Sequence, residues 1–477
     1  REIPKESNHY MRRYLYFFLF INVAVTVAVQ AQDTTRLTLD EALQFAEKNQ
    51  IKIKNAILDQ RSSDARNKEV TGLAYPQLSA KGGLNYAPLV AAFAVPNFIK
   101  TSIVGDPATG MPGLVADQYL DPATVAMTPN TIPLAFQPKW TTTGTLEASQ
   151  ILFDPSVMVA LQARKVLEEL AAKNVELTIQ DVKVGVSKAY YNVLVAEKQH
   201  GLIRQNIARL EQMHFETNEI YKNGLAEKID VDRLKVALNN VKTQEIKLRQ
   251  MISLTYLSLK FQMGMDLSEP IVLTDSLSLE NQGEKVLLQD IDFNQRTEYQ
   301  LLQAQRKLNS YDVKRYKLGW LPTVSLFGNY GYTLYNSERL FKPGDEWQKS
   351  ALIGTSLNVP IFDGFQRRNK LRQAEFTLQK SENDIENLSM SLQLENENAR
   401  INLRNNLLAL ENQRMNMALA EEVYNTARIK YKEGVGSSLE VLDAESALKE
   451  AQTNYFTALY DVITARIDLE KSLGLIN

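Results

Sequence analysis

The residues that could carry enzymatic chemistry are few and poorly spaced. The chain of 477 residues has three His and no Cys, so it offers neither a thiolate nucleophile nor a thiolate metal ligand. His200 and His214 share one face of a long predicted helix, but they lie about 21 Å apart along its axis, too far for one metal ion. No glycine-rich phosphate loop, Gly-x-Ser-x-Gly elbow or His-Glu-x-x-His segment is present. The sequence predicts that the protein is not an enzyme and holds no metal or cofactor.

The charged residues are numerous but balanced. Lys and Arg number 54 against 56 Asp and Glu, a net charge of −2, without the basic surplus of a nucleic-acid-binding protein. The carboxylates are spread along predicted helices beside Lys and Arg, as on solvated helix faces. We therefore expect no nucleic-acid partner, and any transport must take its energy from another protein.

Residues 1–31 have the layout of upstream residues followed by a signal peptide. Met11-Arg12-Arg13 opens a basic region, an apolar run extends from Tyr14 to Val29, and small residues precede a cleavage point after Ala31. A transmembrane anchor is the alternative, although about 16 apolar residues are fewer than the roughly 20 that span a bilayer. The sequence therefore predicts an exported mature protein.

The remainder has the pattern of two copies of one unit. Three short motifs recur after 209 or 210 positions, so the spacing between them is preserved. The pairs are Ile151-Leu152-Phe153-Asp154 with Pro360-Ile361-Phe362-Asp363, Tyr221-Lys222-Asn223-Gly224-Leu225 with Tyr431-Lys432-Glu433-Gly434-Val435, and Phe261-Gln262-Met263-Gly264 with Lys471-Ser472-Leu473-Gly474. Tyr75-Pro76 and Leu321-Pro322 correspond at the larger offset of 246. The extra length of the first copy lies in a Pro-, Gly-, Ala- and Thr-rich loop within residues 87–139.

Each copy contains a long predicted helical hairpin. From Phe365 to Glu433 there is no Gly or Pro, which predicts on the order of 100 Å of continuous helix. Apolar residues keep a seven-residue spacing with one four-residue step, a pattern of left-handed coiling with a local unwinding. They are Leu371, Leu378, Ile385, Leu392, Ala399, Leu403, Leu410, Met417, Tyr424 and Tyr431. Gly224 and Gly434 are the predicted bends, followed by return helices to Met263 and Leu473.

Four further segments alternate with a period of two. Their apolar sides include Leu78 to Tyr86, Trp140 to Ala148, Val324 to Leu334, and Ile353 to Ile361. Strands of this length with one apolar face suit a membrane β-barrel; an antiparallel sheet half buried on a soluble core is the alternative. Four strands cannot close a barrel in lipid, because open edges leave backbone groups unsatisfied. Three chains would supply 12 strands, although a dimer or tetramer also satisfies the arithmetic.

The whole layout resembles the TolC-like outer-membrane efflux protein family. The resemblance rests on the duplicated unit, the strand ends Leu152-Phe153-Asp154 and Ile361-Phe362-Asp363-Gly364, and the hairpin bends; it extends from Leu37 to Gly474. Its most specific segment runs from Tyr431-Lys432-Glu433-Gly434 through Leu439-Glu440-Val441-Leu442-Asp443-Ala444. The resemblance implies an α+β membrane protein. In a homotrimer, a 12-stranded β-barrel in the bacterial outer membrane would be continued by a long α-helical barrel through the periplasm.

The function implied by the resemblance is that of a passive exit duct. Such a channel-tunnel serves a tripartite efflux or type I secretion system, with a periplasmic adaptor (membrane fusion protein), an inner-membrane pump and outer-membrane lipid as partners. The exported substrate and the pump class are not specified by the sequence. A coiled-coil surface protein and a stand-alone porin remain the alternatives from other functional classes.

The predicted organisation has eight segments. They are the upstream residues and signal peptide (1–31), a first-repeat helix (32–74), a first β-hairpin with a long extracellular loop (75–155), a first helical hairpin (156–263), an inter-repeat, equatorial linker (264–290), a second-repeat helix (291–320), a second β-hairpin (321–363), and a second helical hairpin with the C-terminal tail (364–477). The apolar loop 91–139 is also a candidate contact for another protein.

The resemblance places a gate at the periplasmic end of the tunnel. Glu440 and Asp443 match the family's aperture acids; being three residues apart on one helix, they would form two stacked carboxylate rings in a trimer and favour cations. A solvated acidic helix face is the alternative. Asp230 and Tyr431 match the family's locking partners as hydrogen-bonding residues, although Tyr431 also fits the heptad core.

The lock departs from the family pattern in one respect. The family has a basic residue two positions after the bend glycine, where this chain has Gly436 in the second copy and Ala226 in the first. Lys228 and Lys432 are the candidate substitutes.

The bends also resemble the tips that contact adaptors in the family. The candidate contact residues are Gly224, Leu225, Gly434 and Val435. Glycine at these places is also an ordinary helix terminator.

Overall fold

The computed structural model describes residues 35–97, 105–106, 111–112, 129, 131–134, 138–277, 286–336, 338–340 and 343–476. The signal peptide predicted within residues 1–31 and most of the loop 91–139 lie outside these residues. The chain divides into two compact units. Unit 1 consists of Arg1–Ser63, Glu168–Arg306 and Ser381–Asn477, and unit 2 of Asp64–Leu167 and Lys307–Lys380.

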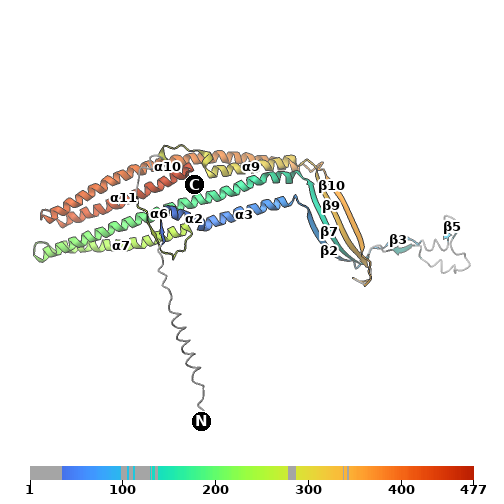
Figure 1. Ribbon diagram of the computed structural model, residues 1–477, viewed down its shortest axis with the longest axis horizontal. Helices are drawn as coiled ribbons and strands as arrows, with labels where there is room; N and C mark the ends of the chain where they lie inside the picture. The colour runs from blue at the N-terminus through green and yellow to red at the C-terminus, as the bar shows by residue number, and fades with distance from the viewer. Residues whose placement is uncertain are drawn as a thin grey trace, which may run out of the picture. The chain divides into compact units, whose positions relative to one another are not determined.

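Unit 2 contains a four-stranded antiparallel sheet. Its strands are β2 (Gln77–Tyr86), β7 (Trp140–Phe153), β9 (Thr323–Asn336) and β10 (Gln348–Asn358), in the order β10-β9-β7-β2 (Figure 1). In the described residues β2 and β10 each pair on one side only. β10 ends at Asn358, short of the predicted Ile361, because Pro360 has no N–H to donate to a ladder.

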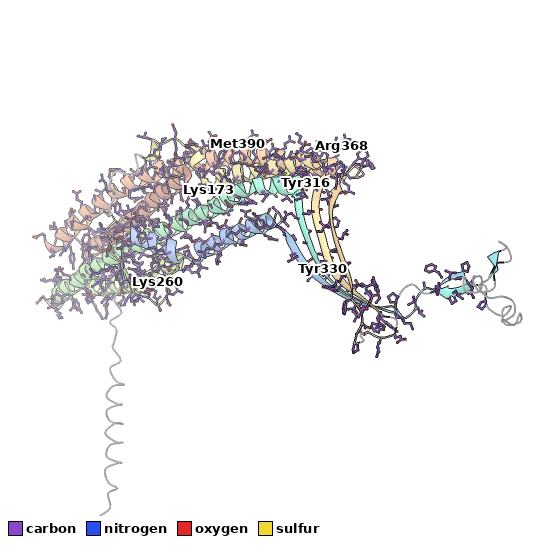
Figure 2. All side chains as sticks on the ribbon, turned by 45° about the vertical axis from the view of Figure 1, so that its right-hand side comes forward. Lys173, Lys260, Tyr316, Tyr330, Arg368 and Met390 are labelled. Carbon is purple, nitrogen blue, oxygen red and sulfur yellow. The ribbon has the colours of Figure 1, made fainter. Side chains whose placement is uncertain are left out.

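One face of this sheet is apolar across all four strands. The register places Leu146 opposite Ala80 and Tyr330, and Tyr330 opposite Ala351. Tyr330 projects from β9 (Figure 2), and its hydroxyl lies 3.0 Å from that of Tyr332. Leu78 and Ile353 on the same face are 77% and 81% exposed. The alternation predicted from the sequence therefore produces an apolar surface that is largely exposed among the described residues, with Leu334 at 3% exposure as an exception.

The predicted loop between β2 and β7 contains short paired strands. β3 (Phe93–Pro96) pairs with β6 (Thr131–Leu134), and β4 (Gly105–Asp106) pairs with β5 (Met111–Pro112), both antiparallel.

Long helices dominate the chain. α6 (Pro155–Lys222) and α7 (Lys228–Met263) form one hairpin, and α10 (Gln366–Lys432) and α11 (Ser438–Leu473) form the other (Figure 1). The ten heptad residues predicted on α10 are all buried or half-buried, among them Leu403 at 0% and Tyr424 at 5% exposure. The heptad pattern thus identified the packed side of the helix. Within the described residues, no helix combines the length and hydropathy of a membrane-crossing segment.

The chain also contains shorter elements, of which α3 (Ile51–Gly72) and α9 (Thr297–Leu318) extend from unit 1 into unit 2. β1 (Thr35–Leu37) pairs in parallel with β8 (Ile271–Leu273), and a single 3₁₀ turn, η1 (Phe293–Gln295), precedes α9 (Thr297–Leu318). The single helix expected over residues 32–74 is two helices, α2 (Leu39–Asn49) and α3 (Ile51–Gly72). The break is at Gln50, whose side-chain amide leaves its own helix and donates to the carbonyl oxygens of Phe261 and Gln262.

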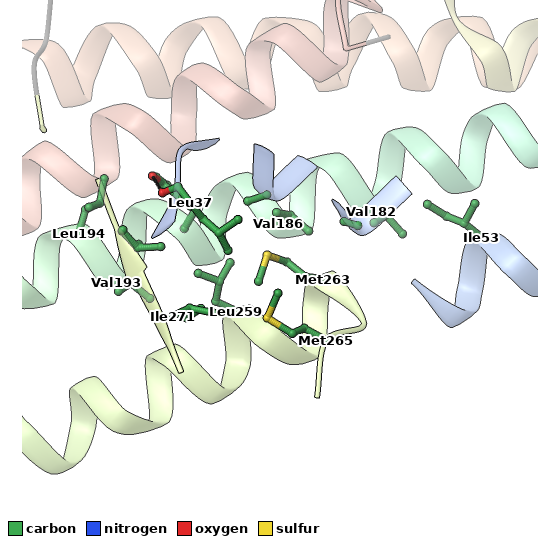
Figure 3. Packing of buried hydrophobic residues seen from close by; sticks show 14 residues of the cluster. Leu37, Ile53, Val182, Val186, Val193, Leu194, Leu259, Met263, Met265 and Ile271 are labelled. Carbon is green, nitrogen blue, oxygen red and sulfur yellow. Dashed lines mark hydrogen bonds between the residues drawn. The ribbon is translucent and has the colours of Figure 1, made fainter. Parts of the chain in front are cut away.

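A buried cluster joins β1, β8, α2, the start of α3, α6 and α7 (Figure 3). Its labelled members are Leu37, Ile53, Val182, Val186, Val193, Leu194, Leu259, Met263, Met265 and Ile271. Tyr190 lies fully buried in the same cluster, with its hydroxyl 2.9 Å from Asp275 Oδ2. Burial and the neighbouring Asp275 raise the pKa of Tyr190 above its usual range, so the phenol stays protonated and can donate to the carboxylate.

The two return helices end in the same way. α7 ends at Gly264 with φ of 70° and α11 at Gly474 with φ of 75°, a conformation that favours glycine. A side chain at Gly264 would meet Gln50 Cα at 2.7 Å, and one at Gly474 would meet Gln295 O at 3.0 Å. Gln50 donates to the end of α7, and Arg296 donates to Ser472 O at the end of α11 with a distance of 2.7 Å. Gln50 and Arg296 are separated by the offset of 246 seen in the sequence, as the two-copy hypothesis requires.

Candidate gate at the hairpin ends

Both hairpin bends are closed by a glycine in the left-handed conformation. Gly224 has φ of 76° and Gly434 has φ of 77°. At the first bend the N–H of Gly224 donates to Tyr221 O and that of Leu225 to Ile220 O; at the second, the N–H of Val435 donates to Lys430 O. This is the Schellman arrangement, which satisfies the last carbonyl groups of a helix. The left-handed backbone conformation is by itself a sufficient reason for glycine at both bends.

The residue after each bend glycine is apolar and uncovered. Leu225 is 82% and Val435 is 77% exposed. In a Schellman bend this residue frequently packs back on the preceding turn. Here both side chains remain exposed to solvent, as expected of residues that contact another protein.

Asp230 connects the return helices of the two hairpins. It lies in the first turn of α7, half-buried, and its Oδ1 accepts a hydrogen bond of 2.6 Å from Ser438 Oγ at the start of α11. Ser438 is 3% exposed. Arg233, one turn along α7, lies 3.8 Å from the same carboxylate oxygen. The bond therefore joins helices whose sequences are separated by about two hundred residues.

Tyr431 makes a second connection between the hairpins. Its hydroxyl lies 2.7 Å from Thr217 Oγ1 on α6, and Thr217 is completely buried. Next to it, Lys432 Nζ lies 3.6 Å from Glu216 Oε1. Of the two candidate replacements for a basic residue at Gly436, Lys432 thus reaches the opposite hairpin, while Lys228 makes no ion pair within the described residues.

Part of the chain matches a known protein family. Residues 295–475 match the outer membrane efflux protein family. The outer membrane protein TolC of Vibrio cholerae is 24% identical over 334 residues, covering 69% of this chain and 76% of that protein. The alkaline protease secretion protein AprF of Pseudomonas aeruginosa is 23% identical over 351 residues, covering 70% of each.

A solved structure has the same fold. The outer membrane protein VceC of Vibrio cholerae superposes with a TM-score of 0.67 at 15% identity, covering 91% of this chain and 96% of that one. The match of residues 295–475, the relatives named TolC and the shared fold together support a TolC-like outer-membrane efflux protein. The chain is therefore a bacterial outer-membrane protein, as the sequence predicted. The matched region contains Tyr431, Glu440 and Asp443; Asp230 lies outside it.

The two acids predicted to line the aperture lie on the solvent side of α11. Glu440 and Asp443 are exposed, whereas Val441, Ala444 and Glu445 between and beside them are buried. Ser437 is the N-cap of α11, and its Oγ accepts from the backbone N–H of Glu440 at 3.1 Å. The two carboxylates therefore have the exposure that either a pore-lining ring or a solvated helix face requires.

The predicted lock residues each bond to a partner that the sequence analysis did not single out. Asp230 bonds to Ser438 and Tyr431 to Thr217. Thr217 follows Leu210 by seven positions, so a polar residue at a core position was the available signal. Ser438 had no such signal, because a serine beside the N-cap of a helix has an ordinary local explanation.

The histidines form no centre in this TolC-like chain. His200 Nε2 lies 2.8 Å from Glu245 Oε1, joining α6 to α7. Among the described residues no group of three or more His, Asp or Glu side chains could hold a metal ion. The polar contacts described above link helices through hydrogen bonds and ion pairs, which can break and form again.

Proposed function

We propose that the protein is a passive, gated channel-tunnel, the exit duct of a tripartite efflux or type I secretion system, and not an enzyme. The main observation that supports this proposal is the four-stranded sheet. Among the described residues it has a largely exposed apolar face and outer edges on β2 and β10 that pair with no further strand. A bilayer tolerates such edges only in a closed barrel, so the sheet needs strands from further copies.

A homotrimer with a 12-stranded barrel is the assembly we propose. A second observation on the helices supports contact between copies. Four apolar residues on the solvent side of α10 keep a seven-residue spacing and are all more than half exposed: Leu394, Ile401, Leu408 and Met415. Ile429, also more than half exposed, follows fourteen positions later, and Glu422 occupies the position between. Such a stripe suits packing against a helix of a neighbouring copy. In this arrangement the helices continue the barrel through the periplasm.

The domain organisation that we propose is the two-copy one given by the sequence. The eight segments keep their predicted bounds, apart from the division of 32–74 at Gln50. The matched ends of α7 and α11 support it, because the two copies use corresponding residues for corresponding contacts.

The gate that we propose consists of the contacts between the hairpins. Asp230–Ser438, Tyr431–Thr217 and Lys432–Glu216 would hold the closed form, and Glu440 and Asp443 would face the aperture. Opening then requires one hairpin to move against the other, with loss of these bonds.

The partners would be a periplasmic adaptor and an inner-membrane pump. The exposure of Leu225 and Val435 supports an adaptor contact at the bends. Each of these residues follows a bend glycine, Gly224 or Gly434. The relative AprF carries protease secretion in its name, and TolC relatives and efflux proteins are also similar to this chain. Outer-membrane lipid would cover the apolar face of the sheet.

Planar-bilayer recordings combined with mass measurement in detergent test the proposal. We expect a species of about three times the chain mass, with a small, cation-selective conductance. A soluble dimer that does not insert would contradict the proposal and favour the coiled-coil surface protein. A large, ungated conductance without affinity for any adaptor would favour the stand-alone porin.

A further inference from the structure

An ion pair is buried between the two helical hairpins, apart from the lock contacts. Arg209 on α6 donates to Glu445 on α11 through two nitrogens, with distances of 3.1 Å for Nη2–Oε1 and 3.3 Å for Nε–Oε2. The Glu445 side chain is 7% and that of Arg209 25% exposed. Arg209 also donates to Asn206 Oδ1, and its guanidinium carbon lies 5.3 Å from the centre of the Tyr424 ring on α10. The pair therefore links α6 to both helices of the second hairpin.

The surroundings of Glu445 are apolar. The pair lies in a cluster of buried side chains from all four long helices: Leu210, Met213, Leu234, Leu238, Val241, Tyr424, Val441, Ala444 and Leu448. Four ion pairs connect the hairpins within the described residues, and the other three have acids that are between 31% and 56% exposed. Arg209–Glu445 is the one whose carboxylate is removed from water.

The charged form of Glu445 is disfavoured at this place. Burial raises the pKa of the Glu445 carboxyl, although Arg209 and Lys449 act in the opposite direction. The titratable or charged groups that face it are Arg209 from α6, Tyr424 from α10 and Lys449 from α11. From α7, Asp232 and Arg233 line the same groove as Glu445. Among the described residues, Arg209 alone bonds to the carboxylate directly.

Glu445 is mechanically tied to the aperture. It follows Asp443 by two positions on α11, so the two side chains lie on opposite sides of the helix, one buried and the other exposed. A displacement of α11 that moves Asp443 and Glu440 must also move Glu445 away from α6. The buried pair is thus placed where it would respond to opening.

We propose that Arg209 is a gating residue, the counter-ion that allows Glu445 to remain buried while the hairpins are closed. The inference rests on the proposed function as a gated duct. Opening would separate α6 from α11 and expose Glu445 to water, which stabilises its charged form. The pair then makes closure depend on the charge of Glu445, in addition to the bonds at Asp230 and Tyr431.

The effects of removing the two partners should differ. Without Arg209, closure leaves an unpaired buried carboxylate, which is strongly unfavourable, so the equilibrium moves toward the open form. Neutralising Glu445 removes the charge that favours opening, so closure is retained. Protonation of Glu445 acts in the same direction as its neutralisation by mutation. A carboxyl whose pKa is raised in the closed form binds protons more tightly there, so acid favours closure.

Conductance of the full-length mature protein tests this directly. We would compare wild type, Arg209→Met, Glu445→Gln and the double variant between about pH 7.5 and about pH 5, a range approaching the carboxyl pKa. Arg209→Met should shift the closed-to-open ratio about tenfold toward open at the higher pH, which corresponds to about 1.4 kcal/mol. Acid or the added Glu445→Gln should restore closure. Lys188→Met, which breaks the half-exposed pair with Asp468 between the same two helices, is the matched control and should behave as wild type.

Two results would overturn the inference. One is an Arg209→Met channel with wild-type conductance across the pH range. The other is a pH dependence that is the same in wild type and Glu445→Gln, which also decides the matter if Arg209→Met fails to assemble. Failure of the proposed function is distinguishable, since the wild-type protein would then form no channel.

Discussion

At the residue scale, the candidate gate depends on hydroxyl and carboxylate groups that bridge helices far apart in sequence. Thr217 is completely buried and Ser438 nearly so, and each has its hydroxyl bonded to the opposite hairpin. A buried polar group left without a partner costs about 1–3 kcal/mol. Removing one partner should therefore weaken closure more than replacing both by apolar groups.

Tyr431→Phe tests the bond to Thr217. The change leaves the buried Thr217 hydroxyl unpaired, so we expect a higher open probability in planar bilayers. Adding Thr217→Val should bring the conductance back toward wild type. Thr243→Val is the control, because the Thr243 hydroxyl bonds only to the carbonyl of Asn239 in its own helix. Equal conductance of Tyr431→Phe and wild type would remove Tyr431 from the gate.

Asp230→Ala tests the bond to Ser438. Losing the acceptor frees the start of α11 from α7, and the conductance should rise. Asp230→Asn should stay near wild type, because its amide oxygen can still accept from Ser438. If the Asn and Ala variants are equally open, the charge of Asp230 and not its hydrogen bond closes the channel.

Glu440→Gln with Asp443→Asn tests the aperture acids. Both side chains are exposed and outside the inter-hairpin bonds, so we expect cation selectivity to fall while the lock is retained. Reversal potentials in a salt gradient measure this. Unchanged selectivity would support the alternative that the two acids belong to a solvated helix face.

At the element scale, Arg296 holds together the helix ends of the second half. Its side chain is 2% exposed and reaches Glu298, Glu395 and the carbonyl oxygen of Ser472 at the end of α11. Although burial alone would raise the pKa of Glu298, the bond from Arg296 keeps it below its usual value. A lowered carboxyl pKa contributes stability above the unfolded-state pKa, and this contribution is lost as the pH falls through the folded-state pKa.

Arg296→Ala should therefore destabilise the protein by about 3 kcal/mol, since it leaves carboxylates without their counter-ion near a buried helix end. The midpoint of thermal unfolding measures the change. The variant should also lose part of the acid sensitivity of wild type. Arg414→Ala, which breaks the exposed pair with Glu411 on α10, should stay within about 0.5 kcal/mol. Similar midpoints for the two variants would show that Arg296 does not hold these helix ends.

At the scale of the whole molecule, two apolar surfaces are largely exposed within the part of the chain that the structure describes. One is the apolar face of the sheet with its open strand edges, and the other is the apolar stripe on α10. In the proposed trimer, further copies and lipid would cover both. A closed barrel with a helical continuation would account for each of them.

Leu408→Asp should therefore impair assembly. The carboxylate would be placed in the middle of the stripe, where contact with a neighbouring copy would bury it. The mass in detergent should shift from trimer toward monomer. Asn402→Asp, an exposed change about 100° around the helix from Ile401 and so outside the stripe, should leave the trimer intact.

The sequence by itself determined the features that depend on local periodicity. The length and packed side of α10, the bends at Gly224 and Gly434, and the apolar sides of the four strands all follow from spacing, glycine and proline. The resemblance to the TolC-like family followed from the order of these features. The end of β10 at Asn358 was missed because the alternation was followed past Pro360 without regard to its missing N–H. The break at Gln50 was missed because it depends on the distant end of α7.

The tertiary structure decided which side chains meet across the hairpins. Thr217 with Tyr431, Ser438 with Asp230, and Arg209 with Glu445 are each more than two hundred positions apart. Their pairing depends on the register of α6 and α7 against α10 and α11. Seven-residue spacing fixes the face that a helix buries, but it repeats along the helix and leaves the axial register open. Only the packing of the four helices selects one register, and with it the polar contacts on which a gate depends.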